Sequence, residues 1–359
     1  MALFVAPGVQ IAGIAAAVPA GRVSNQQLDL FDDGEKQDFI AKIGIDSRRI
    51  APPGLCSSDL CAAAAGRLLQ EAGVDAGSVG VLVFVTQTPD YLLPGNSMVV
   101  QQTLGISSGA LLLDLNQGCA GYLYGLSVIF SVMRTCAIDY GLLLVGDTIT
   151  RLVSPLDRAT LPIFSDAGSA TLLKRAESGR ASYFNLEADG RGCHAICVEG
   201  GGGRHPFGME SLLIREESPG VSRAAIHLGM NGIDVLNYSL KNVAPNIRAL
   251  LDYAHCDQEA VDYFIFHQAN RILNESIVKK CGIPREKVPE TLSEFGNTSS
   301  ATIPLTLSFR LGPTLWREPK KLLLSGFGVG FSWGSALIDT EKLICPPLLE
   351  INCPPDGIQ

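Results

Sequence analysis

The chain has 359 residues, of which 47% are hydrophobic and 18% are charged, and this composition fits a compact soluble protein with a large core in one or two domains. Its net charge of −8 and isoelectric point near 5.2 disfavour nucleic-acid binding. No apolar run reaches the length of a membrane-spanning helix, so we expect no membrane insertion. The mean hydropathy of +0.23 indicates extensive buried strand surface or a large oligomer interface.

The amino terminus and the cysteines bear on the compartment. Residues 1–20 are apolar and rich in alanine, but no basic segment precedes them, so we expect a first β-strand and its loop rather than a signal peptide. The ten cysteines show no disulfide framework. Their one cluster, Cys193 and Cys197 with His194 between them, lacks a second ligand pair, so no metal site is expected. Reduced thiols in the cytoplasm are the simplest interpretation.

Cys119 lies at a predicted junction between a strand and a helix. The apolar run 111–115 predicts a strand, small residues follow, and a helical pattern begins directly after Cys119. Free backbone N–H groups and the helix dipole at such a position favour the thiolate. A thiolate is the form that accepts an acyl group as a thioester. The segment alone is equally compatible with a small, buried cysteine in a core helix.

Two later segments carry polar residues in comparable positions. His267 follows the apolar run 263–266, and Asn297 lies in a polar turn after a predicted helix. Taken singly, His267 could be a hydrogen-bonded core residue and Asn297 a turn residue. Cys119, His267 and Asn297 lie on separate strand exits or loops. Together they favour a shared cleft.

The strand pattern repeats along the chain. The runs 81–85 and 142–146 recur as 263–266 and 322–326 at an offset of about 180 residues, near half the chain length. Such a repeat predicts two similar α/β halves packed together, covering residues 1–180 and 181–359 and meeting around 177–180. Short, continuous apolar strands are typical of sheets that are buried on both faces.

The chain resembles a known family in motifs that run along nearly its whole length. These motifs include Gly44-Ile45-Asp46, Thr88-Pro89-Asp90, Gly118-Cys119-Ala120-Gly121, Met230-Asn231-Gly232, His267-Gln268-Ala269-Asn270, Gly296-Asn297-Thr298-Ser299 and Gly328-Val329-Gly330-Phe331. In order and spacing they are similar to those of β-ketoacyl-acyl-carrier-protein synthase III, a condensing enzyme of the thiolase superfamily. The resemblance implies a thiolase-like α/β fold with two similar halves, five layers in the order αβαβα, and a homodimer.

The resemblance also implies roles for particular residues. Cys119 corresponds to the nucleophile that accepts the acyl group, and His267 and Asn297 to the pair that drives decarboxylation of a malonyl extender. The backbone N–H groups of Cys119 and Val329 correspond to the oxyanion hole. The family often has glycine where this chain has Val329, but the hole needs only the amide. Both His267 and Asn297 side chains can donate to one thioester oxygen.

Further positions are implied to bind the substrate. They are Phe39, Lys42, Leu93, Arg158, Asn270 and Phe327. Phe39 and Lys42 stand in for a tryptophan and an arginine of the family with a spacing one residue shorter, so the choice between coenzyme A and carrier-protein primers stays open. Leu93 is smaller than the usual residue, which indicates a primer longer than acetyl.

A set of basic residues is implied to dock the acidic carrier protein. It comprises Lys241, Arg248, Arg271, Lys279 and Lys280. Lys241 and Arg248 are two helical turns apart and share one helix face. The alternative is an ordinary solvated face without a partner.

The implied activity is a two-step acyl transfer. An acyl group is loaded onto Cys119 and condensed with malonyl-acyl-carrier protein in fatty-acid or related biosynthesis, with coenzyme A or phosphopantetheine thioesters as substrates and no metal or cofactor. The alternatives are a thiolase-fold acyltransferase that forms an ester or amide in specialised metabolism, a non-catalytic subunit, and a cysteine hydrolase. The presence of Asn297 favours carbon–carbon bond formation among these.

Overall fold

The computed structural model describes residues 2–176 and 181–353, and most of these lie in or around two large β-sheets. The six-stranded sheet has the order β17 (Leu349–Ile351), β2 (Val9–Pro19), β8 (Ala167–Arg175), β7 (Tyr140–Asp147), β5 (Val79–Val85) and β6 (Leu111–Leu115). The five-stranded sheet has the order β1 (Ala2–Ala6), β9 (Ser182–Ala188), β16 (Ser332–Asp339), β15 (Lys321–Gly328) and β14 (Tyr263–Phe266).

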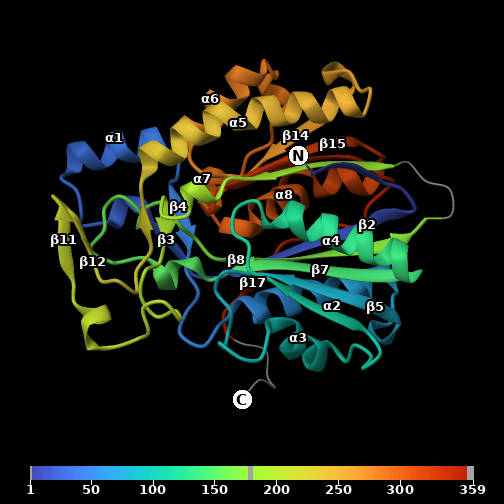
Figure 1. Ribbon diagram of the computed structural model, residues 1–359, viewed down its shortest axis with the longest axis horizontal. Coiled ribbons are helices and arrows are strands. Elements are labelled where there is room, and N and C mark those ends of the chain that lie inside the picture. The colour runs from blue at the N-terminus through green and yellow to red at the C-terminus, as the bar shows by residue number, and fades with distance from the viewer. Residues whose placement is uncertain (1, 177–180, 354–359) are drawn as a thin grey trace.

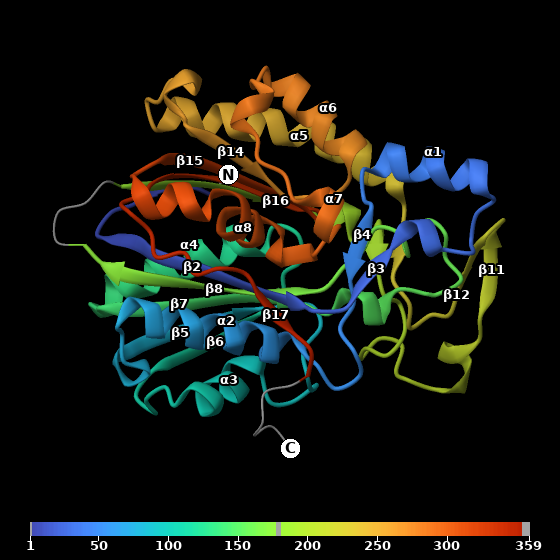
Figure 2. The ribbon, with the colours of Figure 1, turned by 180° about the vertical axis from the view of Figure 1, so that it is seen from behind.

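Helices cover both sheets and separate them, which gives five layers (Figures 1 and 2). From one outer face to the other, the layers are α5 (Gly232–Tyr253) with α6 (Arg271–Cys281), the five-stranded sheet, α4 (Gly121–Cys136) with α8 (Thr302–Arg317), the six-stranded sheet, and α2 (Ser57–Ala72) with α3 (Asn96–Leu104). The predicted αβαβα architecture is confirmed.

Smaller elements gather at one end of the layers. They are α1 (Asp33–Ile43), α7 (Leu292–Phe295) and three two-stranded ladders: β3 (Arg22–Ser24) with β4 (Ser47–Arg49), β10 (Ile196–Cys197) with β13 (Gly229–Met230), and β11 (Arg215–Ser218) with β12 (Val221–Arg223). The ladder β11–β12 lies farthest from the two large sheets (Figure 1).

The two sheets repeat one strand order. In β2–β8–β7–β5 and again in β9–β16–β15–β14, the first two pairs are antiparallel and the third is parallel. Each terminal strand joins the sheet built mainly from the other half of the chain. The amino-terminal β1 pairs with β9 in the five-stranded sheet, and the carboxy-terminal β17 pairs with β2 in the six-stranded sheet. The predicted meeting point at 177–180 lies outside the described residues, so the division at residue 180 stays a prediction.

The central helices explain why the apolar runs form buried strands. Helix α4 buries Leu123, Leu126 and Phe130 between the sheets, in one core cluster with residues of β5, β7, β15 and β16. Each sheet is thus buried on both faces, which accounts for its nearly continuous apolar strands. No helix in the described part of the chain is long and apolar enough to cross a membrane.

The strand order brings distant segments to one end of the molecule. Strands β5, β6 and β7 run parallel in one sheet, and β14 and β15 run parallel in the other. The segments that leave these five strands line a common cavity. Crevices beyond the carboxyl ends of parallel strands are the usual sites of ligand binding in α/β proteins.

Substitution of Gly168 tests how closely α2 packs on the six-stranded sheet. A Cβ atom at Gly168 would lie 2.6 Å from Leu60 Cβ and 2.7 Å from the Cys61 backbone nitrogen. We therefore expect Gly168→Ala to lower the free energy of unfolding by about 3 kcal/mol in urea denaturation. Gly66, inside α2, is the matched control, because its nearest neighbour would lie 3.8 Å away. Gly66→Ala should leave stability unchanged or raise it by up to about 1 kcal/mol; equal effects of the two changes would contradict this packing.

Candidate active site

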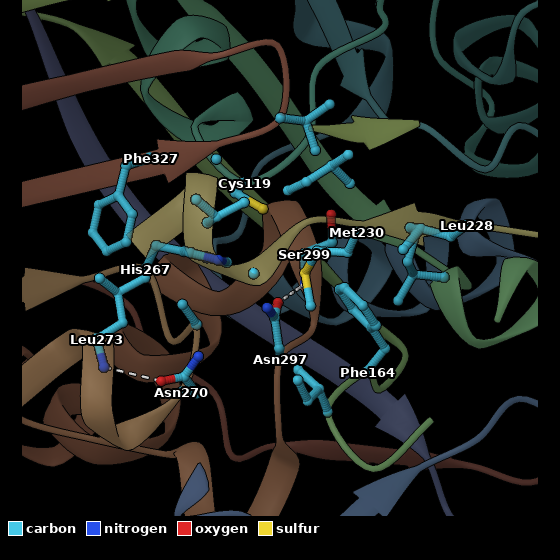
Figure 3. A pocket seen from close by; sticks show the side chains of 18 of the residues that line it. Cys119, Phe164, Leu228, Met230, His267, Asn270, Leu273, Asn297, Ser299 and Phe327 are labelled. Carbon is cyan, nitrogen blue, oxygen red and sulfur yellow. Dashed lines mark hydrogen bonds between the residues drawn. The ribbon is translucent and has the colours of Figure 1, made fainter. Parts of the chain in front are cut away.

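A cavity of about 200 Å³ brings the three predicted catalytic residues together. The side chains of Cys119, His267 and Asn297 point into it from different segments (Figure 3). Asn270, Phe327 and Val329 line it as well. The rest of the wall is mostly apolar and includes Ile43, Ile149, Ile163, Phe164, Ile196, Leu228, Met230, Val235, Leu236 and Leu273. The arrangement can hold an apolar chain against a thiol.

Cys119 stands between β6 and α4, as the sequence predicts, but it is only 6% exposed. Burial raises the pKa of its thiol to about 12, and the carboxylate of Asp147 adds to this rise. The backbone N–H groups of Val329 and Cys119 act in the opposite direction because they stabilise negative charge at this point. The expected thiolate is thus not the resting form, because desolvation outweighs the helix N-terminus.

The end of β15 lies directly against the thiol. A Cβ atom at Gly328 would lie 2.6 Å from Cys119 Cβ and 2.7 Å from Cys119 Sγ, so only glycine fits there without a shift. This close approach brings the next N–H group, that of Val329, to the sulfur. The two backbone donors at Cys119 and Val329 therefore meet at one point, as an oxyanion hole requires.

His267 follows β14 and is 1% exposed. Its Nδ1 lies 2.8 Å from Thr302 Oγ1, and the Thr302 hydroxyl donates to the Ser299 carbonyl at 3.2 Å. Because that hydroxyl has one proton, we assign the imidazole proton to Nδ1, which leaves the Nε2 lone pair for the cavity. Burial lowers the pKa of His267 to about 3, so the ring is neutral. Its edge meets the Phe327 ring at a centroid distance of 5.6 Å.

Asn297 is held by its backbone and by one side of its amide. Its N–H donates to the Ile163 carbonyl at 3.0 Å, and its own carbonyl accepts from the Ser165 N–H at 2.9 Å. Asn297 Oδ1 accepts from the Ser299 N–H at 2.9 Å (Figure 3). Within the described part of the chain, no acceptor takes the Nδ2 hydrogens. The amide therefore presents a fixed donor to the cavity.

The predicted substrate-binding residues divide into two groups. Asn270 and Phe327 line the cavity, and Asn270 also caps α6, because its Oδ1 accepts from the Leu273 N–H at 2.9 Å. The other four do not line it. The Phe39 ring contacts the Phe31 ring in a tilted arrangement with centroids 4.8 Å apart, Lys42 is exposed at the end of α1, Arg158 lies 3.8 Å from Glu35, and Leu93 is 87% exposed.

The predicted docking residues lie on α5 and α6. Lys280 donates to the Leu240 carbonyl at 2.5 Å, which brings the end of α6 beside Lys241. Arg248 and Lys280 both lower the pKa of Cys281, although burial raises it overall. Arg271 lies at the other end of α6 and donates to the Ala41 carbonyl of α1 at 3.0 Å. The basic residues therefore follow α6 from the α1 contact to the α5 contact.

Several residues of the site are not apparent from the sequence. Most of the apolar wall comes from short segments between the large elements, as do Gln87 and Ser299. Thr302 contributes only through His267. Gln87, just beyond the end of β5, and Asp147, the last residue of β7, carry the same strand-exit signal as His267 and could have been found by it.

Known proteins of one family match this chain. Residues 113–190 match 3-oxoacyl-[acyl-carrier-protein] synthase III, and residues 251–340 match the C-terminal part of the same family. Similar curated proteins are β-ketoacyl-[acyl-carrier-protein] synthases III from Neisseria meningitidis, 31% identical over 329 residues, and from Thermosynechococcus vestitus, 32% identical over 330 residues; each alignment covers 92% of this chain and 98% of the relative.

Solved structures agree with the sequence relatives. A 3-oxoacyl-(acyl-carrier protein) synthase from Burkholderia xenovorans matches with a TM-score of 0.91 and 35% identity, over 97% of this chain and 99% of the other. A second structure, of a 3-oxoacyl-(acyl-carrier-protein) synthase III, matches with a TM-score of 0.88 and 37% identity, over 93% of this chain and all of the other. The chain belongs to the 3-oxoacyl-[acyl-carrier-protein] synthase III family of condensing enzymes and has the thiolase fold.

Proposed function

We propose that this protein loads an acyl group onto Cys119 and condenses it with malonyl-acyl-carrier protein, with loss of carbon dioxide, to give a 3-oxoacyl-carrier protein. One observation carries the proposal: a thiol, a neutral imidazole and a fixed amide donor converge in one apolar cavity. Fatty-acid or related biosynthesis is the setting that the relatives' names suggest. Both steps run on side chains and backbone amides, so the proposed chemistry calls for no metal or cofactor.

The first step is acyl transfer to sulfur. Cys119 Sγ attacks the carbonyl carbon of a coenzyme A or phosphopantetheine thioester, and the bond from that carbon to the departing sulfur breaks. The thiol proton passes to His267 Nε2 and then to the departing thiolate. Free proton transfer from a thiol with a pKa near 12 to an imidazole with a pKa near 3 is very unfavourable, so it accompanies carbon–sulfur bond formation. The Cys119 and Val329 N–H groups stabilise the oxyanion.

The second step is decarboxylative condensation. The malonyl carboxylate leaves as carbon dioxide, and its bonding electrons form an enolate that attacks the Cys119 thioester carbon. The Cys119 sulfur departs and takes up one proton from solvent, because the original thiol proton left with the first product, and this completes the cycle. Asn297 Nδ2 donates to the enolate oxygen. The family resemblance implies a second donor in His267, whereas the Nδ1–H tautomer supports a proton acceptor in the first step.

The surroundings of the cavity support the proposed partners. The basic residues along α5 and α6 complement an acidic carrier protein. Strand β6 is an unpaired edge with Leu111 43% exposed, near an exposed loop that contains Leu92 and Leu93. An apolar edge strand of this kind, with four leucines in five residues, favours pairing with a second copy of the chain, so a homodimer is part of the proposal. A smaller Leu93 reaching toward the partner would suit a primer longer than acetyl.

Intact mass spectrometry tests the proposed function directly. The protein is incubated with acyl-coenzyme A primers of increasing length and then with malonyl-carrier protein, and Cys119→Ala is the control. We expect an acyl adduct that requires Cys119 and that the malonyl carrier converts to 3-oxoacyl-carrier protein. An adduct consumed only by an alcohol or amine would establish the ester- or amide-forming alternative, and release of free acid would establish a hydrolase.

Asn297→Ala separates the two half-reactions. Loss of one preorganised donor to an oxyanion costs about 100-fold or more in rate, so decarboxylation should fall by that factor. Acylation of Cys119 should stay within about threefold, because its oxyanion is held by backbone N–H groups. The two rates are measured on one preparation, as adduct formation and as carbon dioxide release. Comparable losses in both would contradict this division of roles.

The pH dependence of decarboxylation tests the state of His267. Burial lowers its pKa to about 3, so the ring stays neutral throughout the range above that value. Carbon dioxide release by the acylated enzyme should therefore show no protonation step between about pH 5 and pH 8, whereas an ordinary histidine titrates near 6.5. Circular dichroism at each pH serves as the control for folding. A single-proton fall in rate centred near pH 6.5 would show a solvated imidazole.

A further inference from the structure

A buried carboxylate lies beneath the proposed site and takes no part in either step above. Asp147 is the last residue of β7 and is 0% exposed. Its Oδ1 accepts from Thr86 Oγ1 at 3.0 Å, from the Gln87 N–H at 2.7 Å and from Thr88 Oγ1 at 3.2 Å. Its Oδ2 accepts from Ser300 Oγ at 2.6 Å and from the Ser300 N–H at 3.3 Å. Five donors thus compensate one buried charge.

The five donors come from two distant parts of the chain. Residues 86–88 follow β5 of the six-stranded sheet, whereas Ser300 belongs to the turn that carries Asn297. Gln87 lines the cavity, and a Cβ atom at Gly118 would lie 2.3 Å from Gln87 Oε1, so this side chain lies beside the nucleophile's segment. Asp147 therefore joins two segments that contribute to the wall of one cavity.

The Asn297 turn needs such an anchor. Ser299 has a φ of 51°, a left-handed conformation that costs a residue with a side chain about 1 kcal/mol. In that conformation its N–H bonds to Asn297 Oδ1, and this bond orients the amide. Strained backbone persists where its surroundings hold it. Ser300 directly follows Ser299, and its two hydrogen bonds to Asp147 hold this part of the turn in place.

Electrostatics exclude the simplest other role for this carboxylate. Negative charge at Asp147 raises the pKa of Cys119 further, in addition to the effect of burial. It therefore disfavours the nucleophilic thiolate and cannot activate it. The same carboxylate also raises the pKa of Cys61, which is fully buried. What Asp147 contributes must lie in its hydrogen bonds.

We infer that Asp147 is a positioning residue, which holds the Asn297 turn and the Gln87 segment in register so that the Asn297 amide meets the enolate oxygen. The inference rests on the proposed decarboxylation. Both oxygens of Asp147 accept hydrogen bonds, so in Asp147→Asn the NH₂ group must replace one of these oxygens and face groups that are themselves donors. Ser300 or Gln87 then shifts, and a shift of about 1 Å near reacting atoms costs about 100-fold in rate.

The test combines two readouts that should move in opposite directions in Asp147→Asn. Carbon dioxide release from malonyl-carrier protein by the acylated variant should fall about 100-fold. Alkylation of Cys119 by iodoacetamide at fixed pH should become about three- to tenfold faster, because a neighbouring negative charge is gone. Peptide mass spectrometry assigns each alkylated cysteine. Cys61 should stay unmodified, as expected for an intact interior.

Asp157→Asn is the matched control. Asp157 is also 0% exposed and accepts from the Ala159 N–H, from Thr160 and from Arg223, but none of these partners lines the cavity, whereas Gln87, a partner of Asp147, does. Asp157→Asn should cost similar thermal stability and leave decarboxylation by the acylated enzyme within about threefold. A similar loss in both variants, an Asp147→Asn rate within twofold of the parent, or modification of Cys61 together with Cys119 would each overturn the positioning role.

The two hypotheses can fail separately. A parent protein that releases no carbon dioxide would refute the proposed function and not this inference. In that case a crystal structure of Asp147→Asn decides: Ser300 and the Asn297 amide displaced from their parent positions would support the inference, and an unchanged turn would overturn it.

Discussion

Burial of the two side chains that meet in the cavity is the constraint on which the rest of the site depends. The Cys119 thiol and the His267 imidazole are almost fully buried, and burial favours the neutral form of each. This neutrality is the opposite of a preformed thiolate–imidazolium pair. In the proposed reaction, charge develops only as bonds change, at points where fixed donors lie, and in a medium of low polarity such donors stabilise charge far more than in water. In the proposed cycle, the same burial protects the acyl-enzyme from hydrolysis.

The duplicated fold supplies the donors without exposing the cavity. The carboxyl ends of the parallel strands of both sheets lie at the cavity. The segment after β6 of one sheet presents Cys119, and the segments after β14 and β15 of the other present His267 and the Val329 amide. Gly328 allows the second sheet to approach the thiol closely. Asp147 then ties the turn of the second half to the strand exits of the first. A single layer of α/β structure could not close around the reacting atoms from both sides.

The sequence predicts those parts of the fold and site that are local. Apolar runs followed by polar residues identify the strands and place Cys119 and His267 at strand exits, and the internal repeat predicts two similar sheets. The sequence carries no local signal that β1 pairs with β9 and β17 with β2, because each pairing joins residues far apart in the chain. The thiolate expectation fails for a similar reason, because the helix N-terminus is visible in the sequence and the burial of Cys119 is not.

For residues at the edge of the site, too, the sequence does not reveal the long-range contacts. Phe39, Lys42 and Arg158 match family positions, but they lie outside the cavity, with Phe39 on Phe31 and Arg158 near Glu35. The apolar wall, Thr302 and Ser299 act through contacts that join segments far apart in the chain, which no spacing rule reveals. Asp147 stands at a strand exit that the sequence reveals, but the four residues that donate to it are not apparent from the sequence.

The most direct test of the neutral pair is the ionisation of Cys119 itself. The ultraviolet absorbance of thiolates is followed during a pH titration of the protein and of Cys119→Ala, and the difference isolates this one thiol. Because burial raises the pKa of this thiol to about 12, we expect no Cys119 thiolate below about pH 10 and a rise in the difference signal toward pH 12. A difference signal with a midpoint below about pH 8 would show that the helix N-terminus and the two backbone amides outweigh desolvation, and it would contradict the account.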